Sequence, residues 1–329
     1  MKKEHVIGVD VSKLTLDLVF HNSGRHLVIE NNLKGFKTFL GQLHQEGIDK
    51  QSCLVVMEHT GLYSAPLERF LAKQEIKYSK VSGLEIKLSQ GIVRGKNDKI
   101  DAKKIAAYGD LHQEKLAVII PSARLELLKK LLNLRERLVA EKAGYQTSLK
   151  EEKAFLNLPS SSRLFKTQEK LIAVLEKEIL QMELEIETVL KEDESLEKNY
   201  TLVKSVIGVG LVMASFMIVY TNNFTKFTHS RKFASYSGVA PFPYQSGTSI
   251  RGKTKVNHLA NKRAKTLLDL CAKSAIVHDQ EIRDYYLRKV ESGKEKMKII
   301  NAVRNKILAR MFAVVKRGTP FEKNYLLAS

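Results

Sequence analysis

Four acidic residues in the N-terminal third of the chain have the types and spacing of a metal-binding set. Asp10 and Glu58 each lie near the end of an apolar, strand-like run, and Asp98 and Asp101 lie three residues apart in a helix-like segment. Residues at i and i+3 share one helix face, so both aspartates can point toward the strand ends. Four converging carboxylates repel one another unless a divalent cation is bound, and their hard oxygens suit Mg²⁺ or Mn²⁺. The set therefore predicts metal-dependent phosphodiester cleavage.

Each carboxylate taken singly has a simpler interpretation, because an Asp after a strand often forms a turn and Asp98 could cap a helix. The catalytic interpretation is favoured by interleaved cations that could meet phosphates, namely Arg94, Lys96, Lys99, Lys103 and Lys104. We predict that the first three bind nucleic acid. A Gly-Val-Asp strand also opens sugar kinases and actin-like ATPases, but the sequence has no second phosphate loop or adenosine-binding Gly-Gly segment to support that alternative.

A second group of residues that could do chemistry follows Tyr236. Pro241 and Pro243 favour extended backbone, and Ser246-Gly247 then leads into a basic segment. A serine hydroxyl in a glycine-flanked turn beside cations could attack phosphorus, although Ser-Gly is also a common loop dipeptide. The basic segment predicts a surface for a DNA or RNA backbone, and its candidate contacts are Arg251, Lys253, Lys255, Lys262 and Arg263.

The net charge of the chain is strongly positive and unevenly distributed. Its 329 residues carry 55 Lys and Arg against 36 Asp and Glu, a formal charge of +19. Residues 1–197 carry 31 basic and 29 acidic side chains, net +2, whereas residues 198–329 carry 24 and 7, net +17. Such a balance favours a polyanionic partner, either a nucleic acid or an anionic membrane. We expect the main positive surface in the C-terminal third.

Cysteine usage and hydropathy exclude several classes of protein. Cys53 and Cys271 have no paired spacing, which argues against a disulfide framework or a zinc ribbon and fits a reducing cytosol. Asp10 and Lys13 interrupt the position where a signal peptide needs an apolar core. The uncharged stretch 205–225 includes Gly, Ser and Asn residues. A membrane span needs about 20 mainly apolar residues, so we expect a buried helix pair instead.

The N-terminal part has the pattern of an α/β sheet. Apolar, β-branched runs predict three successive strands at 5–11, 14–20 and 26–32. A helix from about 34 to 45 follows, and then come a strand at 54–60, a helix at 64–73 and a strand at 76–82. Three strands followed by alternating helix and strand predict an α/β sheet with helices packed on it.

The remainder of the chain is predicted to be helical. Leucines and isoleucines recur at steps of three and four on both sides of Pro159, so we expect an antiparallel helical hairpin or coiled coil over 122–197. It is either a spacer or a dimerisation arm. Beyond it, Leu202–Ser215 has the layout of a helix-hairpin-helix, whose glycines could let backbone amides approach a phosphate or could simply form a structural turn. A turn-rich insert is expected at 237–252.

Several motifs, taken in order, resemble the DEDD transposases of the one-ten family of insertion sequences, a group that includes Piv-type DNA invertases and recombinases guided by a bridge RNA. The resemblance covers essentially the whole chain and rests on VIGVDVSK, VVMEHTG, KNDKIDAKKIA, the helical spacer, SVIGVGLVMA and YSGVAPFPYQSG. The chain departs from the family pattern after the serine, where Ala260 stands in place of a glycine.

The resemblance implies a RuvC-like, RNase H-type N-terminal domain (1–121), a helical coiled-coil spacer (122–197) and a mainly α C-terminal transposase domain (198–329). It implies that Asp10, Glu58, Asp98 and Asp101 are the metal ligands and that Ser246 is the catalytic serine. It further implies a covalent phosphoserine link to DNA, a structured guide RNA that pairs with donor and target DNA, and a homodimer or homotetramer in the bacterial cytoplasm, associated with the nucleoid.

Three functional hypotheses follow. The leading hypothesis is a site-specific DNA recombinase that moves its own element by means of the carboxylates and Ser246. A metal-dependent junction-resolving nuclease of the same N-terminal fold would need the carboxylates and not the serine. A non-catalytic nucleic-acid-binding protein would need neither. The first hypothesis, with a divided active site, accounts best for a charge surplus that lies away from the carboxylates.

Overall fold

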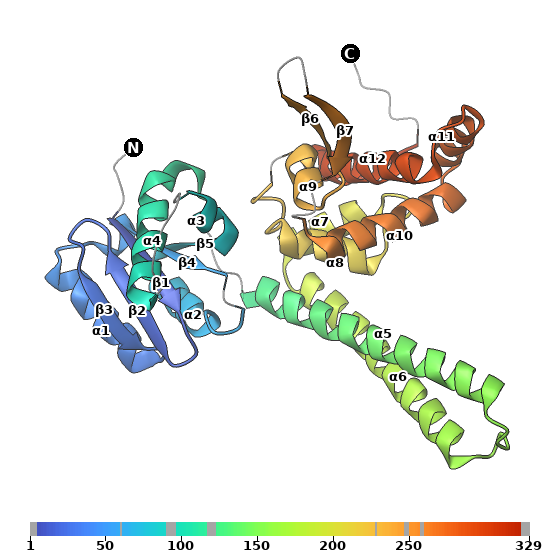
Figure 1. The fold of residues 1–329 in the computed structure, drawn as a ribbon, viewed down its shortest axis with the longest axis horizontal. Helices are drawn as coiled ribbons and strands as arrows, with labels where there is room; N and C mark the ends of the chain where they lie inside the picture. Colours follow the sequence, from blue (N-terminus) through green and yellow to red (C-terminus); the bar gives the residue numbers. More distant parts are fainter. Residues whose placement is uncertain are drawn as a thin grey trace. The chain divides into compact units, whose positions relative to one another are not determined.

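The structure, a computed structural model, describes residues 5–59, 61–89, 97–116, 123–227, 229–246, 250–256 and 260–323 (Figure 1). The chain divides into two compact units, residues 1–122 and 123–329. The first unit contains a five-stranded sheet and the second is mostly helical.

The first unit is a mixed sheet with helices on both faces. Its elements are β1 (His5–Val11), β2 (Thr15–Phe20), β3 (His26–Glu30), α1 (Leu33–Gln45), a short 3-10 turn η1 (Lys50–Ser52), β4 (Cys53–Glu58), α2 (Ala65–Lys73), β5 (Lys77–Val81), α3 (Gly83–Ser89), α4 (Asp98–Leu111) and η2 (Gln113–Lys115). The strand order is β3-β2-β1-β4-β5, antiparallel between β1, β2 and β3 and parallel between β1, β4 and β5. The strands and helices predicted up to residue 82 are confirmed, and α3 was not predicted.

The two faces of the sheet are covered differently. Successive strand residues alternate between faces. On one face Ile7 and Val9 are buried with Phe36 of α1 and Leu67 of α2 in a large apolar cluster. The opposite face is covered by α4, which contributes Ala102 and other small residues.

Contact between α4 and the sheet is made at backbone distance. A Cβ built on Gly8 of β1 would lie 2.3 Å from both the Ala102 carbonyl oxygen and the Ala106 amide nitrogen. A Cβ on Gly109 would lie 2.7 Å from Cγ1 of Val6. Since the contacts move from Gly109 back to Ala102 as β1 advances from Val6 to Gly8, α4 runs antiparallel to β1.

The second unit begins with two long helices. Its elements are α5 (Ala123–Phe155), α6 (Arg163–Lys191), α7 (Glu194–Lys204), α8 (Leu211–Tyr220), α9 (Ser230–Tyr236), β6 (Pro241–Ser246), β7 (Ile250–Val256), α10 (Lys262–His278), α11 (Gln280–Glu291) and α12 (Lys296–Arg317). The base of the α5–α6 hairpin joins one apolar core with α7, α8, α10 and α12, in which Leu128, Ile186, Met213 and Leu268 are buried.

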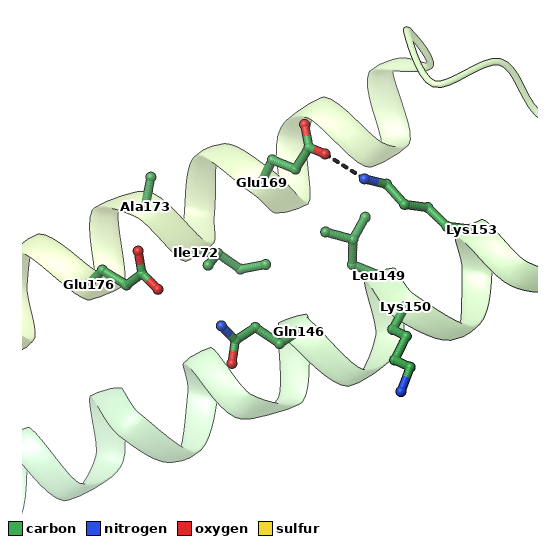
Figure 2. A pocket seen from close by; sticks show the side chains of 8 residues that line it. All are labelled: Gln146, Leu149, Lys150, Lys153, Glu169, Ile172, Ala173 and Glu176. Carbon is green, nitrogen blue, oxygen red and sulfur yellow. Dashed lines mark hydrogen bonds and ion pairs between the residues drawn. The ribbon is translucent and has the colours of Figure 1, made fainter.

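The α5–α6 hairpin is antiparallel, as predicted, and its seam contains charged pairs. Arg124 pairs with Asp193 just beyond the end of α6 (3.5 Å), and along the two helices follow Arg135–Glu183 (2.8 Å), Lys142–Glu176 (3.6 Å) and Lys153–Glu169 (2.6 Å). Toward the tip an open groove of about 380 Å³ lies between the two helices, with Gln146 of α5 and Ala173 of α6 among its lining residues (Figure 2). The seam is therefore apolar at its base, and beyond the base the charged pairs accompany buried apolar side chains such as Ile179 and Phe165.

The turn-rich insert forms a two-stranded antiparallel sheet, β6–β7, which the sequence pattern alone did not predict. Its register shifts between Phe242 and Tyr244, where Pro243 has no N–H to donate. Stretch 205–225 forms α8 and its flanking turns within the core. Among the described residues no helix is long and apolar enough to cross a membrane.

Candidate active site

Parallel pairing places Asp10 and Glu58 next to one another at one end of the sheet. Val9 of β1 pairs with Met57 of β4, so Asp10 and Glu58 are the following residues of the two strands. Asp10 shares the face of Gly8 by strand alternation, and that face carries α4. Both carboxylates therefore stand at the carboxyl end of adjacent strands.

The first turn of α4 supplies the other two carboxylates. Because α4 runs antiparallel to β1, its first turn lies at the end of β1 that carries Asp10. Asp98 and Asp101 occupy this turn, where acidic side chains are favoured by the partial positive charge of a helix N-terminus. The turn is held by Asn97, whose side-chain oxygen accepts a hydrogen bond from the Ile100 amide at 2.7 Å.

The pKa of Asp10 reports the proximity of the other carboxyl groups. The pKa of Asp10 is raised to about 6, first by burial and then by the negative charges of Asp98, Asp101, Glu58 and Asp17. A carboxyl group with this environment is costly to ionise without a cation. All four residues of the predicted acidic set are thus close enough for the other three to act on Asp10.

The carboxylates do not yet form a tight ligand cage. Asp101 accepts a hydrogen bond from Lys104 at 2.8 Å, and the carboxyl group of Glu58 lies over Gly83. In the described part of the chain no three Asp, Glu, His or Cys side chains are grouped closely enough to hold a metal ion. The donor chemistry nevertheless fits a hard divalent cation, which would relieve the repulsion that raises the pKa of Asp10.

Two residues at this site were missed in the sequence. Asp17 of β2 is the strand partner of Asp10 and its carboxylate is bonded to His26 at 2.6 Å. Gly83, at the start of α3, leaves room for Glu58, because a Cβ there would lie 2.1 Å from the Glu58 Oε1 atom. Asp17 could have been found from its position in the second of two adjacent strands. Gly83 carries no such signal, because its role depends on a contact across the sheet end.

The predicted serine nucleophile belongs to the other unit. Ser246 is the last residue of β6, and its backbone is paired with Ile250 of β7. The neighbouring pair joins Gln245 and Arg251. Residues 247–249, which connect the strands, lie outside the described residues. The structure thus places Ser246 at the end of a hairpin, in the unit that does not contain the carboxylates.

The predicted nucleic-acid contacts are distributed over both units. Arg94 and Lys96 lie outside the described residues, and Lys99 is exposed on α4. Arg251, Lys253 and Lys255 occupy alternate positions of β7. Among the two at the start of α10, Lys262 is exposed, whereas the guanidinium of Arg263 is paired with Glu136 of α5 at 3.0 Å. Part of the Arg263 charge is therefore already compensated.

The predicted helix-hairpin-helix is present as α7, a glycine turn and α8. Gly208 has a φ of +91°, and a Cβ there would lie 2.7 Å from the Cys271 carbonyl oxygen of α10. Gly210 has open space around its α-carbon and precedes the first residue of α8. The first glycine thus has a packing role, while the second leaves the start of α8 accessible to a ligand.

Comparison with known families finds two matches on different parts of the chain. Residues 7–151 match a DEDD transposase model of the IS110 type, whose description is "Transposase". Residues 200–287 match the model described as "Transposase IS116/IS110/IS902 family". The first match contains all four predicted carboxylates and the second contains Ser246.

Individual relatives agree with these matches. The chain is 26% identical to a "Pilin gene-inverting protein" of Moraxella bovis over 324 residues, which is 96% of this chain and 97% of that protein. The corresponding protein of Moraxella lacunata has the same identity and coverage. A shorter match, 30% identical over 118 residues, joins it to the "Insertion element IS110 uncharacterized 43.6 kDa protein" of Streptomyces coelicolor and covers 36% of this chain and 29% of that one.

Proposed function

This chain is an IS110-type transposase, an enzyme that recombines DNA, and we propose that it cuts and rejoins DNA at specific sites. In this proposal Ser246 is the nucleophile, and the carboxylate set holds a metal ion that assists the reaction. The observation that supports this most is the proximity of Glu58, Asp98 and Asp101 to Asp10, whose pKa is raised first by burial and then by their negative charges. RuvC-like topology agrees with the strand order β3-β2-β1-β4-β5. The relation to the pilin gene-inverting proteins suggests inversion of a DNA segment as one form of the reaction.

In the proposed cleavage step the Ser246 hydroxyl attacks a phosphodiester phosphorus. A bond forms between the serine oxygen and phosphorus, the bond from phosphorus to one deoxyribose oxygen breaks, and that oxygen takes up a proton. Rejoining is the reverse attack by a DNA hydroxyl, which releases the serine. Arg251, Lys253 and Lys255 of β7 would stabilise the negative charge that grows on the phosphoryl oxygens.

The carboxylate set would hold Mg²⁺ or Mn²⁺ through Asp10, Glu58, Asp98 and Asp101. Such an ion supplies charge stabilisation and polarises phosphoryl oxygens when it is bound. Lys104 keeps the Asp101 carboxylate oriented, and Asn97 keeps the first turn of α4 in place. Since the carboxylates and Ser246 belong to different compact units, we propose a divided active site.

The proposal includes three partners. DNA is the substrate, a structured guide RNA would provide base pairing with donor and target, and a second or further copy of the chain would complete the assembly. The α5–α6 hairpin is the proposed dimerisation arm, packed as a coiled coil in the assembly, because Phe155 near its tip is 87% exposed and Leu156 is 44% exposed. A cytoplasmic, nucleoid-associated location would follow from a DNA substrate.

The decisive experiment compares Ser246→Ala with Asp10→Asn on labelled substrate DNA with Mg²⁺. For Ser246→Ala we expect no covalent protein–DNA adduct and no strand exchange, with DNA binding retained. For Asp10→Asn we expect both products to fall by at least about a hundredfold, since one ligand of the assisting site is lost. An adduct yield that Ser246→Ala leaves unchanged would remove this serine from the mechanism.

The alternative is a metal-dependent junction-resolving nuclease that works without a serine nucleophile. It is favoured by one observation, that all four carboxylates lie within a single compact unit. This alternative predicts that Ser246→Ala still nicks branched DNA at the unmodified rate. Asp10→Asn should then abolish nicking, and no covalent adduct should form with either protein.

Guidance by RNA has its own test. The purified protein should retain one short transcript, identified by sequencing, and should require it for binding of cognate DNA. Equal binding of cognate DNA after treatment with ribonuclease would refute guidance. That result would point to direct recognition by the basic second unit instead.

A further inference from the structure

A lysine-rich cavity lies between the end of α11 and the start of α12, away from Ser246 in the sequence. It has a volume of about 470 Å³, and its lining includes Ile299, Ala302 and the acidic Glu295. Its rim carries Lys289 of α11, Lys294 of the connecting turn and Lys298 of α12. None of these lysines belongs to the predicted contacts of the serine hairpin.

The turn between the two helices holds Lys289 and Lys294 together. Gly293 has a φ of +75°, its amide donates to the Val290 carbonyl at 2.9 Å, and the Lys294 amide donates to the Lys289 carbonyl at 3.2 Å. This pair of hydrogen bonds is a Schellman motif, in which the two residues at the positions of Lys289 and Lys294 often make an apolar contact. Here both positions are cationic. The turn therefore places both lysines on the lining of the same cavity.

Several acidic residues of the second unit are already paired with other cations. Asp269, Asp279 and Glu281 are paired with cations of α10 and α12, among them Arg304 and Arg310. In the described ranges neither Lys289 nor Lys294 has a carboxylate partner. Lys298 is paired with Glu295 at 3.1 Å, but both side chains are more than 70% exposed, so that pair contributes little.

An aromatic ring extends the cavity. Tyr285 lies on its wall, with the Lys289 ammonium 6.0 Å and the Lys306 ammonium 5.5 Å from the ring centroid. Lys306 is already paired with Glu281, whereas Lys289 is not. The ring and the cavity lining thus hold the Lys289 side chain at the rim, where its ammonium can meet an anion.

We infer that this turn is a phosphate-binding site for a polynucleotide backbone, separate from the serine hairpin, with Lys289 and Lys294 as its main contacts. A phosphodiester bound in this cavity could accept charge-assisted hydrogen bonds from both ammonium groups. The inference rests on the nucleic-acid partner of the proposed function. It adds a fixed contact that would orient the strand on the second unit without reading its bases.

The test compares Lys289→Gln/Lys294→Gln with the unmodified full-length chain on duplex DNA and on single-stranded RNA of the same sequence. We expect affinity to fall by at least about tenfold at 0.1 M salt, and the slope of log K against log salt to decrease by about 1 per lysine. The nucleic acid for which the slope changes more is the one that the site holds. Because neither lysine has a carboxylate partner in the described ranges, the double variant should leave the melting temperature unchanged or higher, which a structural role for these lysines would not predict.

Lys273→Gln is the matched control, because Lys273 belongs to the same unit, is exposed and is already paired with Asp269 at 2.9 Å. It should change the slope by less than half as much as either cavity lysine. A double variant that binds like the unmodified chain, or a control with the same slope change, would overturn the site while leaving the nucleic-acid partner in place. Failure of the unmodified chain to bind either polynucleotide would overturn both.

Discussion

The packing of α4 on β1 and the packing of α5 on α6 use different kinds of contact. α4 packs on β1 at backbone distance, because Gly8 has no side chain and lies against the backbone of Ala102 and Ala106. Between α5 and α6, pairs of long charged side chains such as Arg135 and Glu183 accompany the apolar contacts along much of the hairpin. The first contact has no freedom to adjust, because backbone atoms cannot rotate away. The second can adjust by changing rotamers, so it tolerates substitution more easily.

The difference matches what each interface has to hold. α4 carries Asp98 and Asp101 to the end of β1, and a shift of the helix by a fraction of its radius would separate them from Asp10. The α5–α6 hairpin carries none of the predicted catalytic residues. Close backbone packing thus occurs between α4 and β1, where the distances between the carboxylates matter for the proposed chemistry. Charged pairs occur between α5 and α6, where only the alignment of two helices has to be kept.

Gly8→Ala should break the tighter contact and have the largest effect. Its Cβ would lie 2.3 Å from two backbone atoms of α4, so the helix must move, and we expect the first unit to lose about 3 kcal/mol of stability. Urea unfolding monitored by circular dichroism checks this. Gly41→Ala in α1 is the control, because nothing lies within 4 Å of its Cβ position. It should stabilise the helix by roughly 0.5–1 kcal/mol.

Gly83→Ala tests a tight contact whose neighbour is a flexible side chain. The new Cβ would displace the Glu58 carboxyl group, which can rotate, so stability should change by less than about 1 kcal/mol. DNA cleavage should still fall roughly tenfold or more, because one proposed ligand has moved. Mn²⁺ titration and cleavage assays together measure this. Unchanged metal affinity would mean that Glu58 is not required at its observed position.

Asp10→Asn should stabilise the metal-free protein at neutral pH. The pKa of Asp10 is raised to about 6 from 3.8, so the folded state binds more protons than the unfolded state between these values, and stability falls as pH rises through that window. After allowance for solvent screening we expect about 1 kcal/mol. The variant should be more stable at pH 7.5 and should lose this part of the pH dependence, as measured by urea unfolding with chelator present.

Arg135→Met should have the smallest effect. It removes the pair with Glu183 but keeps the length and most of the apolar area of the side chain in the seam. We expect a loss below about 1 kcal/mol, because Glu183 is partly solvated and can rotate into water. A loss as large as that of Gly8→Ala would erase the contrast between the two interfaces.

Local sequence patterns were sufficient for most of the first unit and for the α5–α6 hairpin of the second. The strand runs at 5–11 and 54–60 and the hairpin break at Pro159 were predicted because periodicity and turn chemistry are local properties. Glu58 over Gly83 and Asp17 beside Asp10 were not, because both contacts arise from pairing across the sheet. The pairing of Arg263 with Glu136 joins residues 127 positions apart, which no spacing rule anticipates. The β6–β7 hairpin was missed because two prolines argue against a strand unless a register shift accommodates one of them.

The charged pairs of the α5–α6 hairpin also mean that the length of the hairpin can change while its base stays the same. Arg135 and Lys142 are seven residues apart on α5, and their partners Glu183 and Glu176 are seven apart on α6, so the interval between these two pairs is two helical turns on both helices. Removing or inserting one such block on each helix would shift the tip by about 10 Å and leave the base unchanged. Evolution or an engineer could therefore change the reach of this arm without redesigning the units that it serves.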